Sequence, residues 1–213
     1  MLMLRSVRRT MLSIKRFEDN IKSKVKDMDV LKEKIFTEKD LMKLSCKGRY
    51  ELIKGVVYEM SPGGQKHGFI ASRIGYIISN YVYENKLGIT TGAETGYKLC
   101  SNPDTVRAPD LAFESNDKLK EKGIIDGYSS IMPDLVVEVN SPSDSYVKII
   151  KKVNEWLDAG VNQVWVIDPD DCSVAVYYSP EKYKIYNSGD TLSGGEILPG
   201  FKCKVEDIFT YSR

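Results

Sequence analysis

The sequence predicts a mixed α/β fold of the α+β type, with a mixed central sheet flanked by helices and with additional β-hairpins. The continuous apolar run Leu135–Val139 is typical of a strand that is buried on both faces. Apolar residues recur at spacings of three and four from Phe69 to Val82, which predicts an amphipathic helix. Strands and helices do not alternate regularly along the chain, so a regular βαβ architecture is not expected.

The predicted elements follow one another from Thr37 onwards. Thr37-Glu-Lys-Asp40 resembles a capping box that opens a short helix, and Lys54-Gly55 is the expected turn of a first hairpin. Gly160 is placed as the C-terminal stop of a second long helix. In chain order we expect a helix near 37–44, a hairpin within 50–60, a helix ending near 84, strands at 89–99 and 106–113, a polar connection at 115–130, a strand at 135–139, a helix at 144–159, a strand at 161–167, and a hairpin at 173–178 and 182–186.

The chain of 213 residues is expected to form one domain, residues 35–213, preceded by a basic helical extension, residues 1–34. The whole chain has a net charge of +1, yet residues 1–34 hold ten Lys and Arg against five Asp and Glu. Such a segment is typical of a solvated helix or of one packed against a partner. A basic arm for nucleic acid or for a membrane surface is the alternative.

Several classes of protein are disfavoured by what the sequence lacks. The four cysteines are scattered without a CxxC motif, and with the single histidine, His67, they make a poor zinc set. Free thiols and the lack of a secretory signal favour the cytoplasm, and no apolar run is long enough to span a membrane. Without GxGxxG or GxxxxGK[ST], no nucleotide cofactor is expected.

Two acidic residues occupy comparable places on predicted strands. Asp110 follows Ala108-Pro109, and Glu138 interrupts the apolar run near its end. Burying an ionised carboxylate costs several kcal/mol unless a metal, a cation or hydrogen bonds compensate it. If the two strands are neighbours, both carboxylates could hold Mg²⁺, or Mn²⁺ in its place, which would polarise a phosphate or activate water. We therefore expect a metal site formed by Asp110 and Glu138.

Hydrolysis of a phosphodiester also benefits from a lysine near the attacking water or the developing charge. The familiar arrangement places it two residues after the second acid, where this sequence has Asn140. The following helix offers Lys148, Lys151 and Lys152, of which only Lys152 lies at the margin of the apolar face. From there its stem could run along the sheet and reach Glu138. Lys152 is therefore the predicted catalytic lysine.

A chain of motifs runs between about Phe36 and Phe209, in the order RYELIKG, EMSP, VRAPDLAF, PDLVVEVNSPSD, VWVIDP and GDTLSGGEILPGF. Together they resemble the Uma-two family of restriction endonucleases, within the PD-(D/E)XK nuclease-like superfamily. The resemblance implies a restriction-endonuclease-like α-β-β-β-α-β core and a divalent-metal site, and we expect a metal-dependent nuclease that acts on DNA. It also matches Asp110 and Glu138 to the two acids and Lys152 to a lysine displaced into the helix, with Trp156 where tyrosine is common.

Other residues and functions stay open from the sequence alone. Glu94 could be an extra ligand from the first strand, and His67, which matches a family histidine, could support the site or only cap or pack its helix. Glu51 matches the family's YEL, but a hydrogen bond within the hairpin explains it equally well. A homodimer is expected because cutting a duplex needs two centres. The alternatives are a catalytically silent nucleic-acid-binding or scaffold protein, and hydrolysis of a small phosphoester.

Overall fold

The computed structural model describes residues 34–44, 48–142 and 144–211. The chain divides into two compact units, residues 1–35 and 36–213. The helical extension expected over residues 1–34 lies outside the described residues, Lys34 excepted. The second unit carries all the helices and strands that the structure describes.

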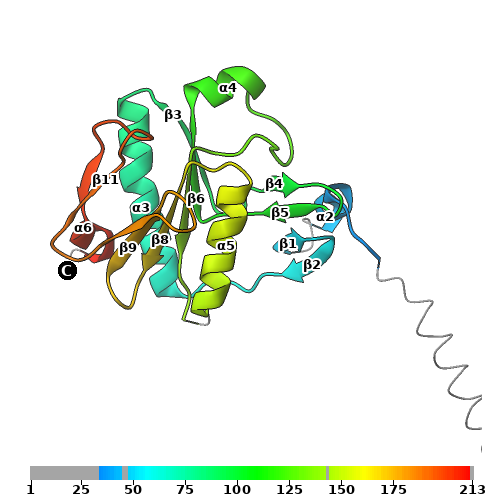
Figure 1. Cartoon of the computed structure of the whole chain (residues 1–213), viewed down its shortest axis with the longest axis horizontal. Helices are drawn as coiled ribbons and strands as arrows, with labels where there is room; N and C mark the ends of the chain where they lie inside the picture. The colour runs from blue at the N-terminus through cyan, green and yellow to red at the C-terminus, as the bar shows by residue number, and fades with distance from the viewer. Residues whose placement is uncertain (1–33, 45–47, 143, 212–213) are drawn as a thin grey trace, which may run out of the picture. The chain divides into compact units, whose positions relative to one another are not determined.

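The larger sheet of this unit has six strands in the order β10-β9-β8-β7-β6-β3 (Figure 1). Its two central strands, β7 and β8, run parallel, and every other neighbouring pair is antiparallel. The sheet is therefore mixed, as predicted. The strands are β3 (Gly88–Gly92), β6 (Leu111–Ser115), β7 (Leu135–Val139), β8 (Gln163–Asp168), β9 (Ser173–Tyr177) and β10 (Tyr183–Tyr186).

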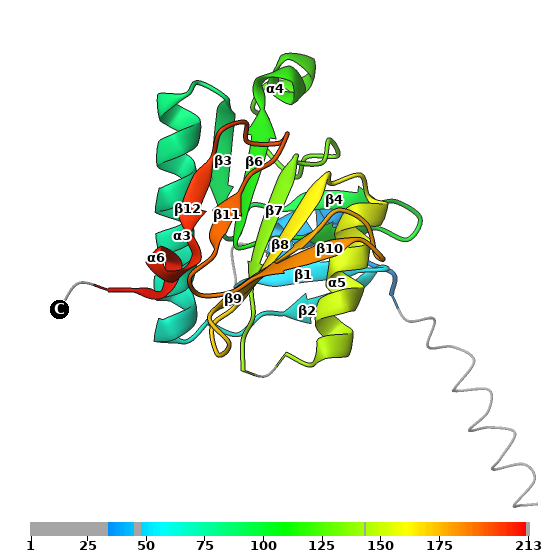
Figure 2. The ribbon, with the colours of Figure 1, turned by 60° about the vertical axis from the view of Figure 1, so that its left-hand side comes forward.

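Two helices cover the two faces of this sheet, α3 (Gln65–Glu84) on one and α5 (Tyr146–Asp158) on the other (Figure 2). Side chains alternate along β7, so Val137 packs with the core under α3, whereas Val136 packs with the core under α5. All five residues of β7 are buried, which confirms the strand that the apolar run predicted. A polar side chain at position 138 must therefore face α5.

A second sheet has the order β2-β1-β5-β4 and carries the predicted hairpin as β1 (Tyr50–Ile53) and β2 (Val56–Glu59). Two of the predicted strands were wrong because each is divided between the sheets. Residues 89–99 form β3 and β4 (Tyr97–Cys100), and residues 106–113 form β5 (Thr105–Arg107) and β6. Pro109, which has no backbone N–H to donate, lies in the second break, so Asp110 directly precedes β6.

The remaining described elements are short. The polar connection contains α4 (Asn116–Lys122), and near the C-terminus a hairpin of β11 (Thr191–Ser193) and β12 (Lys202–Lys204) leads into α6 (Val205–Phe209). The predicted capping box opens α2 (Glu38–Leu44), where the backbone N–H of Thr37 donates to Asp40 at 3.1 Å. Among the described residues, no helix has the length and apolar character needed to cross a membrane.

Candidate active site

Glu138 and Asp110 lie opposite each other on neighbouring strands. In the antiparallel β6–β7 ladder Leu111 pairs with Val137, so one further step places Asp110 opposite Glu138. Glu138 points to the α5 face, like Val136, and is only 9% exposed. The register thus brings together the two acids that were predicted from the sequence.

Both carboxylate oxygens of Glu138 accept hydrogen bonds from α5. Lys152 Nζ lies 2.7 Å from Oε2, and the indole Nε1–H of Trp156 donates to Oε1 at 2.8 Å. The two donors are four residues apart, so they stand one above the other on the same face of the helix. The other lysines of α5, Lys148 and Lys151, are exposed. The contact between Lys152 and Glu138 forms as predicted, while the catalytic role of Lys152 stays a prediction.

The charge of Glu138 is only partly compensated by these bonds. Burial raises its pKa to about 7, with the negative charges of Asp110 and Glu51 acting in the same direction and Lys152 acting against them. Burial lowers the pKa of Lys152, but Glu138 and Glu51 outweigh that effect and hold the pKa above its ordinary value. Lys152 therefore stays cationic near neutral pH. Because it compensates the carboxylates only in part, a further cation would be attracted to the site.

Asp110 is held in place by the backbone and by the single histidine of the chain. Its Oδ2 accepts a hydrogen bond from the backbone N–H of Val139 at 2.8 Å and lies 3.3 Å from Nε2 of His67, in the first turn of α3. Burial would raise the pKa of Asp110, but these two partners outweigh it, and the pKa lies below its ordinary value. The hydrogen bond to Asp110 raises the pKa of His67 in turn. The structure thus places His67 beside the acid pair.

A second charged cluster adjoins the first and was missed by sequence reasoning. Leu52 of β1 pairs with Val106 of β5, and one step further in this antiparallel register Glu51 lies opposite Arg107. Arg107 Nη1 lies 2.6 Å from Glu51 Oε2, and the other side of the guanidinium donates to Glu155 of α5. Both Glu51 and Arg107 are buried. Charged residues at buried strand positions were a signal that could have found them.

This cluster reaches the acid pair through Lys152. Glu51 Oε1 lies 4.0 Å from Lys152 Nζ and also accepts a hydrogen bond from the backbone N–H of Ala108 at 3.3 Å. Lys152 is therefore flanked by two carboxylates, Glu138 at contact distance and Glu51 slightly further away. A hydrogen bond within the hairpin was one explanation of Glu51 from the sequence, but its ionic partners, Arg107 and Lys152, belong to β5 and α5.

Two residues singled out from the sequence have other partners. Glu94 was considered as an extra ligand from the first strand, against the alternative of an exposed strand acid. It lies in the turn after β3, is 65% exposed at its side chain and pairs with Arg49 at 3.1 Å. Its positive φ of 76° belongs to that turn. Asn140, which stands where the catalytic lysine is usually found, donates from Nδ2 to Asp168 at 3.3 Å. This residue therefore links the ends of β7 and β8.

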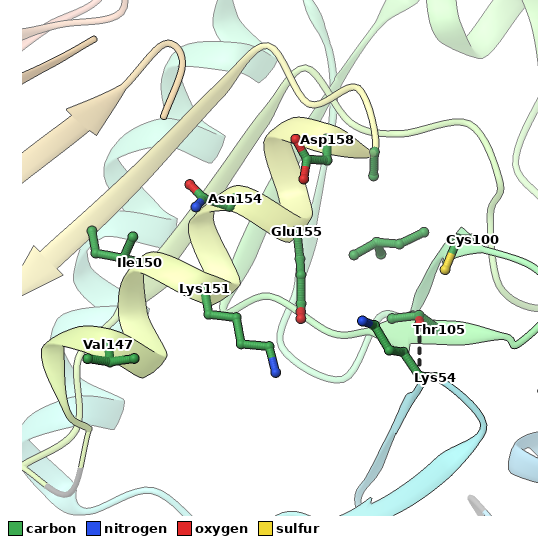
Figure 3. A pocket seen from close by; sticks show the side chains of 11 residues that line it. Lys54, Cys100, Thr105, Val147, Ile150, Lys151, Asn154, Glu155 and Asp158 are labelled. Carbon is green, nitrogen blue, oxygen red and sulfur yellow. Dashed lines mark hydrogen bonds between the residues drawn. The ribbon is translucent and has the colours of Figure 1, made fainter. Parts of the chain in front are cut away.

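Two pockets border these clusters. One of about 290 Å³ lies against the start of α3 and the loop after β7, and both His67 and Asn140 line it. The other, of about 540 Å³, lies between α5 and the residues of β4, β5 and the β1–β2 turn, and Glu155 lines it (Figure 3). The smaller pocket is lined by His67, which contacts Asp110 of the acid pair, and the larger one by Glu155, which contacts Arg107 of the second cluster.

The fold is that of a nuclease-like protein. A crystal structure from Anabaena variabilis, described as a "putative nuclease belonging to DUF820", matches with a TM-score of 0.70 and 22% identity, over 82% of this chain and 97% of that one. A search of curated proteins gave no match. Residues 40–206 match the model of the Uma2 family, described as "Putative restriction endonuclease", and the chain belongs to this family.

Proposed function

We propose that this protein is a divalent-metal-dependent nuclease that hydrolyses phosphodiester bonds in DNA. One observation carries the proposal: Asp110 and Glu138 lie opposite each other, with the Nζ of Lys152 2.7 Å from Glu138 Oε2. Two strand carboxylates and a buried cation at one point are suited to placing a metal ion, a water molecule and a developing negative charge side by side. Membership of the Uma2 family supports the same class of reaction.

The donor set fits Mg²⁺ or Mn²⁺. Carboxylate oxygens are the ligands that these cations prefer, and Mg²⁺ commonly takes one or two of them and fills its other positions with water and substrate phosphate. Among the described residues, no three His, Cys, Asp or Glu side chains are grouped so as to hold a metal ion by themselves. Asp110 and Glu138 would supply two carboxylates to the metal, which when bound would polarise a phosphate oxygen and lower the pKa of water.

The protein's own groups would orient the reactants. Lys152, held between Glu138 and Glu51, would donate to the attacking water or to a phosphate oxygen as negative charge develops. Trp156 fixes the second oxygen of Glu138, so the carboxylate keeps one orientation. His67 holds Asp110 from the other side. Each group is buried or half-buried, where electrostatic interactions are stronger than in water.

The test is a cleavage assay on supercoiled plasmid and on labelled oligonucleotides, with Mg²⁺, with Mn²⁺ and with EDTA. We expect metal-dependent cleavage by the wild type and a loss of about 100-fold or more in Glu138→Gln and in Lys152→Gln, which remove a charge but keep hydrogen-bonding groups. Lys148→Gln is the matched control, because it makes the same change at an exposed position of the same helix. Retained cleavage in Glu138→Gln would contradict the proposal.

The same assay separates the alternatives. A protein that binds the oligonucleotide in EDTA and in Mg²⁺ alike, without cutting, would be a nucleic-acid-binding or scaffold protein with a nuclease fold. Hydrolysis of bis(p-nitrophenyl) phosphate without any cleavage of DNA would indicate a small phosphoester as the substrate. Cleavage of RNA in preference to DNA would correct the substrate and leave the reaction class in place.

A further inference from the structure

The larger pocket has the size and the walls of a ligand site. Its volume of about 540 Å³ falls within the roughly 300–1,000 Å³ that is usual for small-molecule sites. Figure 3 shows α5 on one side and Lys54, Cys100 and Thr105 on the other. The apolar part of the lining is aliphatic and comes from both sides: Leu99, Val147, Ile150 and Ala159.

Two lysines give one end of this pocket a positive charge. Lys54 extends from the β1–β2 turn and Lys151 from α5, and their side chains approach the pocket from opposite sides (Figure 3). In the part of the chain that the structure describes, neither lysine forms an ion pair. Of the two acids in the lining, Glu155 is bound to Arg107, and Asp158 lies away from the lysines. The lysine end is therefore suited to an anionic group.

An amide side chain adds a hydrogen-bonding group to the apolar part. Asn154 lines the pocket, and its Oδ1 is buried without a hydrogen-bond partner among the described residues. A buried amide oxygen without a donor costs about 1–3 kcal/mol, so an amide at such a place is more typical of ligand recognition than of packing. With its side chain turned towards the pocket, Asn154 would accept from an amino or imino group of a ligand.

The pocket is joined to the candidate active site through a short chain of contacts. Glu155 in its wall binds Arg107, Arg107 binds Glu51, and Glu51 lies 4.0 Å from Lys152 Nζ. Lys151 of the pocket and Lys152 of the site are also consecutive residues of α5. The pocket and the candidate active site therefore adjoin the same Glu155–Arg107–Glu51 cluster.

We propose that this pocket is a nucleotide subsite, which takes an unstacked base of the nucleic acid next to the phosphate held at the acid pair. The aliphatic wall would contact the faces of the base, Asn154 would bond to its edge, and Lys54 and Lys151 would hold the adjoining phosphate. Enzymes that act on nucleic acids commonly hold an extruded base between apolar groups. The inference rests on the proposed function in taking nucleic acid as the ligand and the acid pair as the place of its phosphate.

The test measures binding in EDTA, so that hydrolysis does not enter the result. The probes are a fluorescein-labelled single-stranded DNA and an abasic strand of the same length, with fluorescence anisotropy as the readout over a range of salt concentrations. The charge variant is Lys54→Ala with Lys151→Ala, and its matched control is Lys182→Ala with Lys202→Ala, two exposed lysines on other elements. Asn154→Leu removes the amide and keeps the volume. Circular dichroism checks the fold of each variant.

We expect the charge variant to bind roughly 10-fold more weakly at low salt. Its salt slope should fall by about 0.7 for each phosphate that the lysines no longer neutralise, while the control keeps the wild-type slope. The wild type should prefer natural DNA to the abasic strand, and Asn154→Leu should narrow that preference. Equal binding by the charge variant and its control, or by the two probes to the wild type, would overturn the subsite.

Failure of the subsite and failure of the proposed nuclease are distinguishable. If the wild type cleaves DNA but the pocket variants bind both probes like the wild type, the subsite is wrong and the nuclease stands. If the wild type never cleaves but the variants lose affinity as expected, the subsite stands and the hydrolysis is wrong. Displacement of the strand by low concentrations of a free deoxynucleoside monophosphate would overturn the subsite in favour of a free nucleotide as the ligand.

Discussion

Glu138 is a buried carboxyl group with a pKa of about 7, against 4.5 for the ordinary group, and this difference predicts how stability changes with pH. Between these two values the folded protein binds more protons than the unfolded chain, so the free energy of unfolding falls as the pH rises. The contribution of Glu138 is fully present below pH 4.5, and about 3 kcal/mol of it is lost above pH 7.

Urea unfolding in EDTA at a series of pH values would measure this contribution. Glu138→Gln lacks the titrating group, so its stability relative to the wild type should increase by about 3 kcal/mol between pH 4.5 and pH 8. The comparison removes the titration of the other acids from the result. A difference that stays constant across this range would show that Glu138 is ionised throughout.

His67 is the only histidine of the chain, so its pKa can be read directly from its ring proton signals in an NMR titration. The hydrogen bond to Asp110 should place the pKa above the ordinary 6.5, and Asp110→Asn should bring it down. The stability from this pair is fully present below pH 6.5 and is lost as the pH rises through the raised value.

A nearby acid provides the control for this titration. Asp170 lies on the same pocket as His67 but pairs with Lys66 at 2.8 Å, so Asp170→Asn should shift the pKa of His67 much less than Asp110→Asn does. Equal shifts in the two variants would mean that His67 responds to the general field of the pocket and not to a bond with Asp110.

At the scale of residues, sequence reasoning worked where a local pattern carried the information. A charge within an apolar strand selected Glu138, and the helical period selected Lys152 from three lysines. The Glu51–Arg107 pair was not found, because its two strands are far apart in the chain and only the register of β1 with β5 shows that the residues are opposite each other. Glu94 was misplaced because its carboxylate projects from a turn and not from a strand.

At the scale of elements, Arg107 ties the smaller sheet to α5. Its guanidinium lies between Glu51 of β1 and Glu155 of α5, and the two carboxylates hold its pKa above the ordinary value although burial acts against this. Arg107→Met would leave Glu51 buried with only Lys152, at 4.0 Å, as a cationic partner. We expect a loss of about 3–5 kcal/mol in the free energy of unfolding, measured by urea denaturation.

Arg49→Met is the matched control for this prediction, since it removes the same type of side chain from the exposed pair with Glu94. Exposed pairs contribute at most about 1 kcal/mol, so the control should stay close to the wild type. If both variants lose the same small amount of stability, the ion pairs of Arg107 stabilise the fold no more than an exposed ion pair does.

The two strands that sequence reasoning predicted wrongly share one cause. Periodicity identified the residues of β3 and β4, and of β5 and β6, as extended, but it could not show that the chain changes sheets within each run. The break before β6 matters for function, because it leaves Asp110 just ahead of the strand, where its Oδ2 accepts from the backbone N–H of Val139. The long helices α3 and α5, which have a clear period, and the continuous apolar strand β7 were all predicted.

At the scale of the whole molecule, the proposed nuclease is expected to act on duplex DNA as a homodimer, because one centre cuts one strand at a time. Light scattering after size-exclusion chromatography should give twice the mass of one chain. Linearised plasmid should appear together with the nicked form at concentrations where the dimer is present. Linear product from a protein that is monomeric under the same conditions would contradict this expectation.

The two hydrogen bonds from α5 to Glu138 make the geometry of the site depend on the position of this helix. Because Lys152 and Trp156 occupy both oxygens, the carboxylate cannot rotate about its last bond without breaking one of the two contacts. The orientation of the Glu138 carboxylate is therefore set by the position of α5 on the sheet, and not by a free choice of side-chain rotamer. A partner or ligand that rotated α5 by a fraction of a turn would break the contacts of Glu138 with Lys152 and Trp156 together. We therefore expect the arrangement of acid and lysine to be lost in a single step.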